Sequence, residues 1–249
     1  MSASSTGPTA GLLVIGEEIL SGKVADENSG FLARELRALG VEVRRIEVIP
    51  DIEAEITEAV RRFSQRFDLV FTSGGIGPTH DDVTWPAVAA AFDMRLVQRP
   101  ELEQLVRASL GGEFHARDLR MALVPEGARL EYGVPPDLNR WPVIAVANVY
   151  VFPGIPLILR RKFDSVRELY RAGPIHGRAV YSRDGEGSIA DTLDAVVAEF
   201  PSVAIGSYPR IDAADHKVKI TLDGRDAAAV EDATARLIER LGAAVVRKE

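Results

Sequence analysis

The sequence predicts an α/β fold, doubly wound, with a mainly parallel sheet and helices on both faces, followed by a smaller α+β unit. Over the first two thirds of the chain, strand-like apolar runs alternate with helix-like segments, and this alternation is typical of a parallel sheet covered by helices. The composition then changes at 172–177, where AGPIHG indicates a linker. Beyond the linker the order of predicted elements is different.

The elements of the first part follow from hydrophobic periodicity. Apolar runs or period-two alternation predict strands, at 11–16, 41–49, 68–73, 143–146 and 149–152. Apolar residues at helical spacing predict helices, at 25–39, 52–67, 87–92, 101–110 and 156–170. Thr84 is the predicted N-cap of the helix at 87–92, because a threonine hydroxyl can accept from the first helical N–H groups.

The second part has the order strand, helix, strand, strand, helix, strand. Its strands are predicted at 178–182, 203–208, 217–222 and 243–247, and its helices at 188–200 and 226–241. This is the βαββαβ order of ferredoxin-like domains. We therefore expect a disordered N-terminus at 1–10, an α/β domain at 11–171 and a ferredoxin-like α+β domain at 178–249.

Composition excludes several classes of function. With a net charge of −7 and a pI near 5.3, the chain is not expected to bind nucleic acid or an anionic membrane. The absence of cysteine excludes disulfides and thiolate metal sites. No apolar run approaches membrane-spanning length and the N-terminus lacks the pattern of a signal peptide, so we expect a cytoplasmic protein.

The stretch FTSGGIGPTHDDVT at 71–84 is the most informative motif. Its strand delivers the chain to the carboxyl edge of the sheet, where α/β folds hold their ligands. Glycines 74, 75 and 77 allow close approach of the backbone to a ligand, and the next helix presents its positive end. The pattern suits a phosphate but is neither a P-loop nor a dinucleotide fingerprint. A tight strand-to-helix turn without ligand is the alternative.

Carboxylates gather around this loop in the sequence. Asp81 and Asp82 end the motif, Glu17 and Glu18 follow the first strand, and Asp51 follows the second. Three parallel strands thus end in acids at one sheet edge. Acids beside a phosphate need a cation between them, and Mg²⁺ typically binds through one or two carboxylates plus phosphates. The alternative is that one aspartate caps a helix and the other is solvated.

Three segments resemble a known family: IGEEILSGKVADENSGFLARELRALG, the Pro50-Asp51 pair and SGGIGPTHDDVTWPAVAAAF. Together they are similar to the molybdopterin-binding (MoaB/Mog-like) domain family of molybdenum-cofactor biosynthesis. The closest resemblance is to the N-terminal domain of competence/damage-inducible protein A (CinA) and to the corresponding domain of bifunctional FAD synthases. NVYVFPGIP at 148–156 and the C-terminal segments VAIGSYPR and KVKITLD favour the FAD-synthase version.

The resemblance implies a site and an activity. It assigns functional carboxylates to Asp51 and Asp82, with Asp81 and Glu18 beside them, and a metal to Asp51, Asp82 and Asp81. It assigns phosphate or substrate binding to Gly16, Asn28, Ser73, Gly74, Gly75, Gly77, Pro78, Thr79, His80, Pro153 and Gly154. The implied function is a metal-dependent nucleotide pyrophosphatase cleaving FAD or ADP-ribose. The implied cofactor is Mg²⁺, Mn²⁺ or Co²⁺, with K⁺ as a further candidate, and the implied assembly is a homodimer or homotrimer.

Two other functions stay open. One is adenylyl transfer to molybdopterin, against which VPPDLNRWPVIAVAN counts, since it replaces an Ala-Pro-Gly segment of cofactor-binding members. The other is a catalytically silent binding module, which the apolar Leu157 after PGIP would fit. Two expectations concern packing: Trp85 is predicted to pack against the sheet, and the basic segment RRKF at 160–163 to form the solvated face of a helix.

Overall fold

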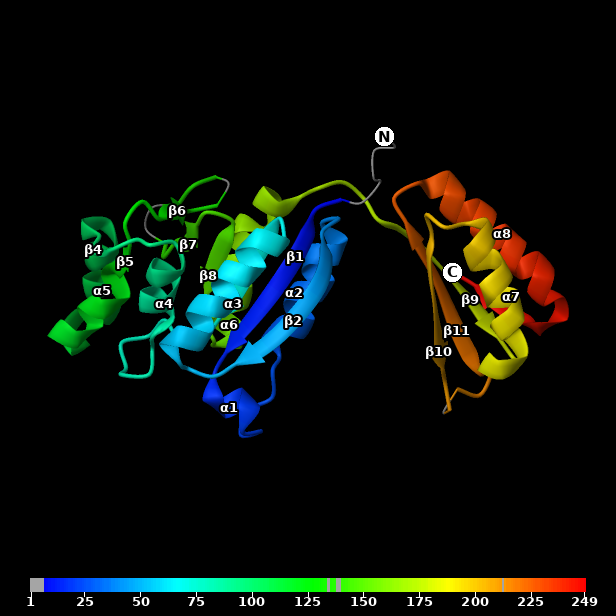
Figure 1. Ribbon diagram of the computed structural model, residues 1–249, viewed down its shortest axis with the longest axis horizontal. Coiled ribbons are helices and arrows are strands. Elements are labelled where there is room, and N and C mark those ends of the chain that lie inside the picture. Colours follow the sequence, from blue (N-terminus) through cyan, green and yellow to red (C-terminus); the bar gives the residue numbers. More distant parts are fainter. Residues whose placement is uncertain (1–6, 134, 138–139, 212) are drawn as a thin grey trace. The chain divides into compact units, whose positions relative to one another are not determined.

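The computed structural model describes residues 7–133, 135–137, 140–211 and 213–249. They form two compact units, Gly7–Ala172 and Gly173–Glu249 (Figure 1). No helix in these described ranges is long and apolar enough to cross a membrane.

The first unit is built on a six-stranded sheet in the order β2-β1-β3-β8-β7-β6. Strands β2, β1, β3 and β8 are parallel, whereas β7 pairs antiparallel with β8 and β6 with β7. The strands are β1 (Thr9–Ile15), β2 (Glu42–Ile49), β3 (Leu69–Ser73), β6 (Arg129–Glu131), β7 (Val143–Val146) and β8 (Val149–Phe152); β4 (Leu96–Gln98) and β5 (Leu123–Pro125) form a separate pair.

Helices cover both faces of this sheet (Figure 1). They are α1 (Glu17–Leu20), α2 (Asn28–Ala38), α3 (Glu53–Arg66), α4 (Thr84–Ala91), α5 (Pro100–Leu110) and α6 (Pro156–Val166), with 3-10 helices η1 (Gly111–Glu113), η2 (Ala116–Ala122) and η3 (Arg167–Tyr170). Helices α3 and α4 contribute to one buried cluster, and α2 and α6 to a second. The predicted doubly wound α/β fold is confirmed.

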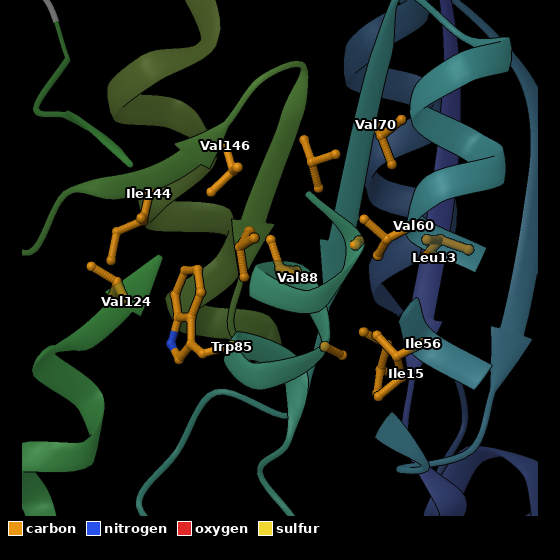
Figure 2. Close-up of a cluster of buried hydrophobic side chains, with 14 of the residues drawn as sticks. Leu13, Ile15, Ile56, Val60, Val70, Trp85, Val88, Val124, Ile144 and Val146 are labelled. Carbon is orange, nitrogen blue, oxygen red and sulfur yellow. The ribbon is translucent and has the colours of Figure 1, made fainter. Parts of the chain in front are cut away.

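Strand β1 shows how the sequence divides between the two cores. Leu13 and Ile15 belong to the cluster with α3 and α4, and Ala10 and Leu12 to the cluster with α2 and α6. Successive side chains of a strand point to opposite faces, so a continuous apolar run is required here. Figure 2 shows the first cluster, in which Trp85 lies among Val88, Val124 and Ile144. The expected packing of Trp85 is confirmed by its 5% exposure.

The strand order also fixes where a ligand can bind. From β1 the chain passes to β2 on one side and then returns to β3 on the other side of β1. The direction of winding therefore reverses between β1 and β3, and ligands of open α/β folds bind outside the carboxyl ends at such a switch point.

The second unit has the ferredoxin-like arrangement. Its antiparallel sheet has the order β10-β11-β9-β12, and its two helices pack through one apolar cluster onto that sheet. The elements are β9 (His176–Ser182), α7 (Glu186–Glu199), β10 (Ala204–Pro209), β11 (Val218–Gly224), α8 (Ala227–Leu241), the 3-10 helix η4 (Gly242–Ala244) and β12 (Val245–Lys248).

Several expectations are corrected. Thr9 and Ala10 already belong to β1, so predicted disorder is wrong for them, while residues 1–6 lie outside the described residues. Helix α6 ends at Val166 and continues as η3. Segment 160–163 is not fully solvated, because Phe163 is buried and Lys162 donates to the carbonyls of Trp141 and Pro142. Of the segment replacing Ala-Pro-Gly, Val134, Leu138 and Asn139 lie outside the described residues.

Candidate functional site

The four parallel strands of the first unit end level with one another. Ile15 pairs with Ile49, Val14 with Ser73, and Ser73 with Phe152. The segments directly after these residues are those singled out in the sequence: Gly16 to Glu18, Pro50-Asp51, Gly74 to Asp82, and Pro153-Gly154. The structure therefore brings most of the predicted site residues to one sheet edge, at the switch point between β1 and β3.

Backbone geometry explains the glycines of the loop. Gly74 has φ +111° and Gly75 φ +64°, conformations that L-residues with side chains seldom adopt. A Cβ on Gly74 would collide with the carbonyl oxygen of Ile15, and one on Gly75 with the hydroxyl of Thr84. Gly154 lies against Gly74, since a Cβ on Gly154 would be 3.4 Å from the Gly74 Cα. Glycine is therefore needed at positions 74 and 75, where the ends of β1 and β3 meet.

Asp82 holds the second half of the loop. Its Oδ1 accepts from the Gly77 N–H at 2.6 Å and its Oδ2 from the Thr79 N–H at 2.8 Å. The Thr79 hydroxyl donates to Asp81 Oδ1 at 2.6 Å, and this hydrogen bond is the main reason why the pKa of Asp81 is lowered. The loop is thus closed by its own carboxylates.

Two backbone N–H groups of the loop lack a hydrogen-bond acceptor among the described residues. Among the residues that the structure describes, the N–H groups of Gly75 and Ile76 have no hydrogen-bond partner, although both residues are only partly exposed. Partly buried N–H groups normally find an acceptor. Oxygens of an anion are suitable acceptors for adjacent N–H groups at a strand-to-helix loop.

Asp51 is the carboxylate at this edge whose pKa is raised. Its Oδ2 accepts from the Glu17 N–H at 2.8 Å. Burial raises the pKa of Asp51, and the charges of Glu18, Asp81 and Asp82 raise it further, against the opposing effect of the Glu17 N–H. The four carboxylates therefore repel one another, and no ion pair within the described residues neutralises Asp51, Glu18 or Asp82.

The donor set fits a cation shared with a ligand better than a cation held by protein alone. In the described part of the chain, no three His, Cys, Asp or Glu side chains are grouped closely enough to hold a metal ion. Magnesium-type sites commonly use one or two carboxylates and complete their shell with phosphate oxygens and water. One or two acids of this edge would meet that requirement.

Asn28 connects three of the converging segments. Its side-chain amide donates to Ser73 Oγ at 2.9 Å and to the Gly154 carbonyl at 2.7 Å, while its buried Oδ1 has no partner among the described residues. Asp26 fixes the start of α2 by accepting from the N–H groups of Asn28 and Ser29. A cavity of about 50 Å³ lies here, lined in part by Glu18, Asn28, Ser73 and Gly154. Its volume suits water rather than a nucleotide.

Other predicted residues are placed less centrally. The His80 side chain is 97% exposed and lies 3.8 Å from Asp81, so it does not shape the loop. Pro78 is half-buried, and Pro153 accepts a long 3.5 Å hydrogen bond from Ser73. Thr84 is not the N-cap of α4; Val83 occupies that position. The buried Thr84 hydroxyl instead donates to the Gly74 carbonyl at 3.0 Å, because the loop folds back over the helix start.

Sequence reasoning missed Arg120. Its guanidinium donates to the Thr79 carbonyl at 2.7 Å, from a 3-10 helix 41 positions downstream. No local pattern marks this arginine, because only the packing of η2 brings it to the loop. It adds a cation beside the glycines.

Comparison with known families gives a match to each unit. Residues 11–171 match the family described as "Probable molybdopterin binding domain", and residues 174–249 match "FAD synthase, middle domain". The resemblance expected from the sequence is confirmed.

Similar proteins include both kinds of relative that the sequence indicated, and an archaeal protein besides. A protein of Archaeoglobus fulgidus is 34% identical over 92% of this chain and 96% of its own length. A probable FAD synthase of Caenorhabditis elegans is 34% identical over 96% of this chain and 51% of its own length. A CinA-like protein of Parasynechococcus marenigrum is 31% identical over 95% of this chain and 58% of its own length. This chain thus spans nearly all of the archaeal relative but only about half of the FAD synthase.

A solved structure of a CinA protein is also similar to this chain. The protein CinA of Thermoplasma acidophilum, described as of unknown function, has a TM-score of 0.58 and 26% identity, with 65% of this chain and 98% of that chain covered.

Proposed function

The chain belongs to the molybdopterin-binding domain family, and from this premise we propose that its α/β unit is a metal-dependent nucleotide pyrophosphatase that cleaves a dinucleotide such as FAD or ADP-ribose. One observation carries the proposal: within the described residues, N–H groups of the partly exposed Gly75 and Ile76 without acceptors and carboxylates without counter-charges lie at the same sheet edge. A pyrophosphate accompanied by a divalent cation would satisfy both.

The phosphate side of the site is supplied by the loop backbone. The N–H groups of Gly75 and Ile76 would donate to phosphoryl oxygens, and the N-terminus of α4 would add its positive dipole end. Asp82 would act mainly as a positioning residue, since its two oxygens hold the N–H groups of Gly77 and Thr79. Asn28 would keep Ser73 and Gly154 level with each other through its amide.

The carboxylate side of the site is centred on Asp51. Asp51, with Asp81 or Glu18, would hold Mg²⁺, Mn²⁺ or Co²⁺ together with the phosphates of the ligand. When bound, the cation would offset negative charge on the phosphoryl oxygens and lower the pKa of the attacking water. The protein's own task is to keep Asp51 partly desolvated, which strengthens its interaction with any cation.

The test is release of mononucleotide from FAD and from ADP-ribose, with Mg²⁺, Mn²⁺ or Co²⁺ added in turn. Asp51→Asn is expected to lower kcat by about 100-fold or more, the scale of removing one electrostatic contact at a reacting centre. Asp82→Ala should abolish turnover by opening the loop. Glu42→Gln, at the opposite end of the strand that leads to Asp51, is the control and should leave the rate unchanged.

Full activity in Asp51→Asn, or cleavage that does not depend on added metal, would contradict the proposal. Circular dichroism of each variant would show that loss of activity is not loss of folding.

One observation favours a second candidate, a module that binds a nucleotide or pterin without turning it over. Ile155 and Leu157 are each 59% exposed directly beyond Gly154. Apolar side chains there suit contact with a ring or a partner rather than chemistry at a phosphate. Tight nucleotide binding with no cleavage under any of the three metals would support this candidate instead.

A further inference from the structure

The sheet of the C-terminal unit leaves one face free of its own helices. Val180, Val218, Ile220 and Leu222 point to the face that packs with α7 and α8, and Figure 1 shows both helices on the same side of this sheet. Side chains at the intervening positions of β9 and β11 must point to the other face.

That other face carries a row of side chains drawn from all four strands. Tyr208 of β10 pairs with Lys219 of β11, Lys219 pairs with Tyr181 of β9, and Tyr181 pairs with Arg247 of β12. Aromatic and cationic residues therefore alternate across the sheet at one level.

The cations of this row pack on the central tyrosine. The Arg247 guanidinium lies 4.0 Å and the Lys219 ammonium 5.6 Å from the centre of the Tyr181 ring. His216 meets the same ring edge-on at 4.8 Å. Tyr181 is only 4% exposed as a result. The ring supports the cations by cation–π contact and is not itself open for stacking.

A pocket of about 500 Å³ lies over this row. Its lining includes Tyr181, Pro209, Arg210, His216, Lys219 and Arg247, which we call the cationic pocket. The volume falls within the range of small-molecule sites, about 300 to 1,000 Å³. It exceeds what one inorganic anion would fill.

The charges in the cationic pocket are only partly neutralised. Arg247 contacts Asp215 at 3.0 Å and Glu249 at 3.5 Å. Arg210 and Lys219 form no ion pair with any residue that the structure describes. As far as the described residues go, two cations are left for a ligand, with a third shared.

His216 adds an unmet polar atom. It is 8% exposed, its Nδ1 lies 2.7 Å from Asp215 Oδ1, and its Nε2 is buried without a hydrogen-bond partner in the described ranges. A buried polar atom without a partner is costly. With Nδ1 paired to Asp215, Nε2 is the ring nitrogen left to contact a ligand in the cationic pocket.

We propose that the cationic pocket binds the phosphate group of a small phosphorylated molecule. A phosphate offers several oxygens and up to two negative charges, matching two cations without an ion pair among the described residues, a shared guanidinium and the Nε2 of an imidazole. Single-stranded nucleic acid fits less well, because it is held by exposed aromatic rings along a basic groove and Tyr181 is covered. The inference does not depend on the pyrophosphatase activity, since every contact belongs to the C-terminal unit.

The experiment follows the imidazole signal of His216 in the full chain by nuclear magnetic resonance, assigned by its loss in His216→Asn. Inorganic phosphate, pyrophosphate and AMP are titrated in the presence of a metal chelator. We expect a saturable shift of the His216 signal for at least one of them. The probe concentration at the midpoint of the titration should be raised at least tenfold in Lys219→Gln and in Arg210→Gln. Arg210 is exposed and Lys219 is partly exposed, and neither belongs to the apolar cluster of this unit, so these variants should fold.

Two controls keep this test separate from the proposed function. Arg178→Gln removes an exposed arginine of the same sheet, paired with Glu231, and should leave the midpoint unchanged. Asp51→Asn should also leave it unchanged, whatever its effect on turnover. The proposal is overturned if no probe gives saturation, if Lys219→Gln binds as well as the unaltered chain, or if only a single-stranded oligonucleotide moves the His216 signal.

Discussion

The two units gather polar groups in different ways. In the α/β unit, the carboxyl edge of the sheet collects loop segments that follow four parallel strands, and its uncompensated side chains are carboxylates. In the C-terminal unit, a sheet face collects one side chain from each of four antiparallel strands, and its uncompensated side chains are cations. The first arrangement depends on backbone conformation at glycines, whereas the second depends on strand register.

This difference predicts a large effect of substitution at Gly74. Gly74→Ala would introduce a Cβ against the Ile15 carbonyl at a φ of +111°. Overpacking of this kind costs about 1–3 kcal/mol, and the positive φ adds about 1–2 kcal/mol. We expect the α/β unit to lose about 3 kcal/mol of unfolding free energy and to lose phosphate binding.

Gly127→Ala is the matched control, since Gly127 has φ +80° and nothing lies within 4 Å of the position that an added Cβ would take. It should cost only about 1–2 kcal/mol. Both tryptophans, Trp85 and Trp141, lie in the α/β unit, so their fluorescence during denaturant unfolding reports this unit alone. Equal losses of unfolding free energy in the two variants would show that the contact between the ends of β1 and β3 does not contribute to stability.

A further prediction compares one lysine from each unit, Lys219 and Lys162. Lys219 lines an open pocket, whereas Lys162 is buried and donates to the carbonyls of Trp141 at 3.1 Å and Pro142 at 2.6 Å. Burial lowers the pKa of Lys162 from 10.5 to about 7. Between these values the unfolded chain binds a proton that the folded chain does not, so stability should rise with pH across that window.

The slope contributed by Lys162 should approach about 1.4 kcal/mol per pH unit near the middle of the window. Lys162→Met should remove this contribution, which is measured as the difference between the two stability curves from pH 7 to pH 10. Parallel curves would mean that Lys162 stays protonated in the folded protein.

Much of the architecture could be predicted because it rests on periodicity. The apolar run of β1 and the helical spacing of α3 report burial directly, and the alternation of both kinds of segment implies a doubly wound sheet. Strands β4, β5 and β6 were not predicted, since each has three residues and too few positions to show a period. Their conformation is determined by tertiary pairing.

The candidate site likewise has residues that local sequence predicts and residues that only tertiary packing brings in. The glycine loop and Asp51 could be found because they directly follow predicted strands. Arg120 and the role of Thr84 could not, because one arrives through the packing of η2 and the other depends on how the loop folds back. The cationic pocket also escaped prediction, because its cations are far apart in the sequence and only strand register aligns them.

The measurement that tests the central claim most directly is the affinity of the full chain for Mn²⁺, followed by electron paramagnetic resonance. It is made with and without ADP-ribose, within a time too short for turnover. If the loop takes phosphate and the carboxylates take a cation at the same edge, Mn²⁺ should bind weakly alone and at least tenfold more tightly with ADP-ribose present. Asp51→Asn should abolish that gain. Mn²⁺ affinity that is unaffected by ADP-ribose, or a gain that survives Asp51→Asn, would contradict a shared site at this edge.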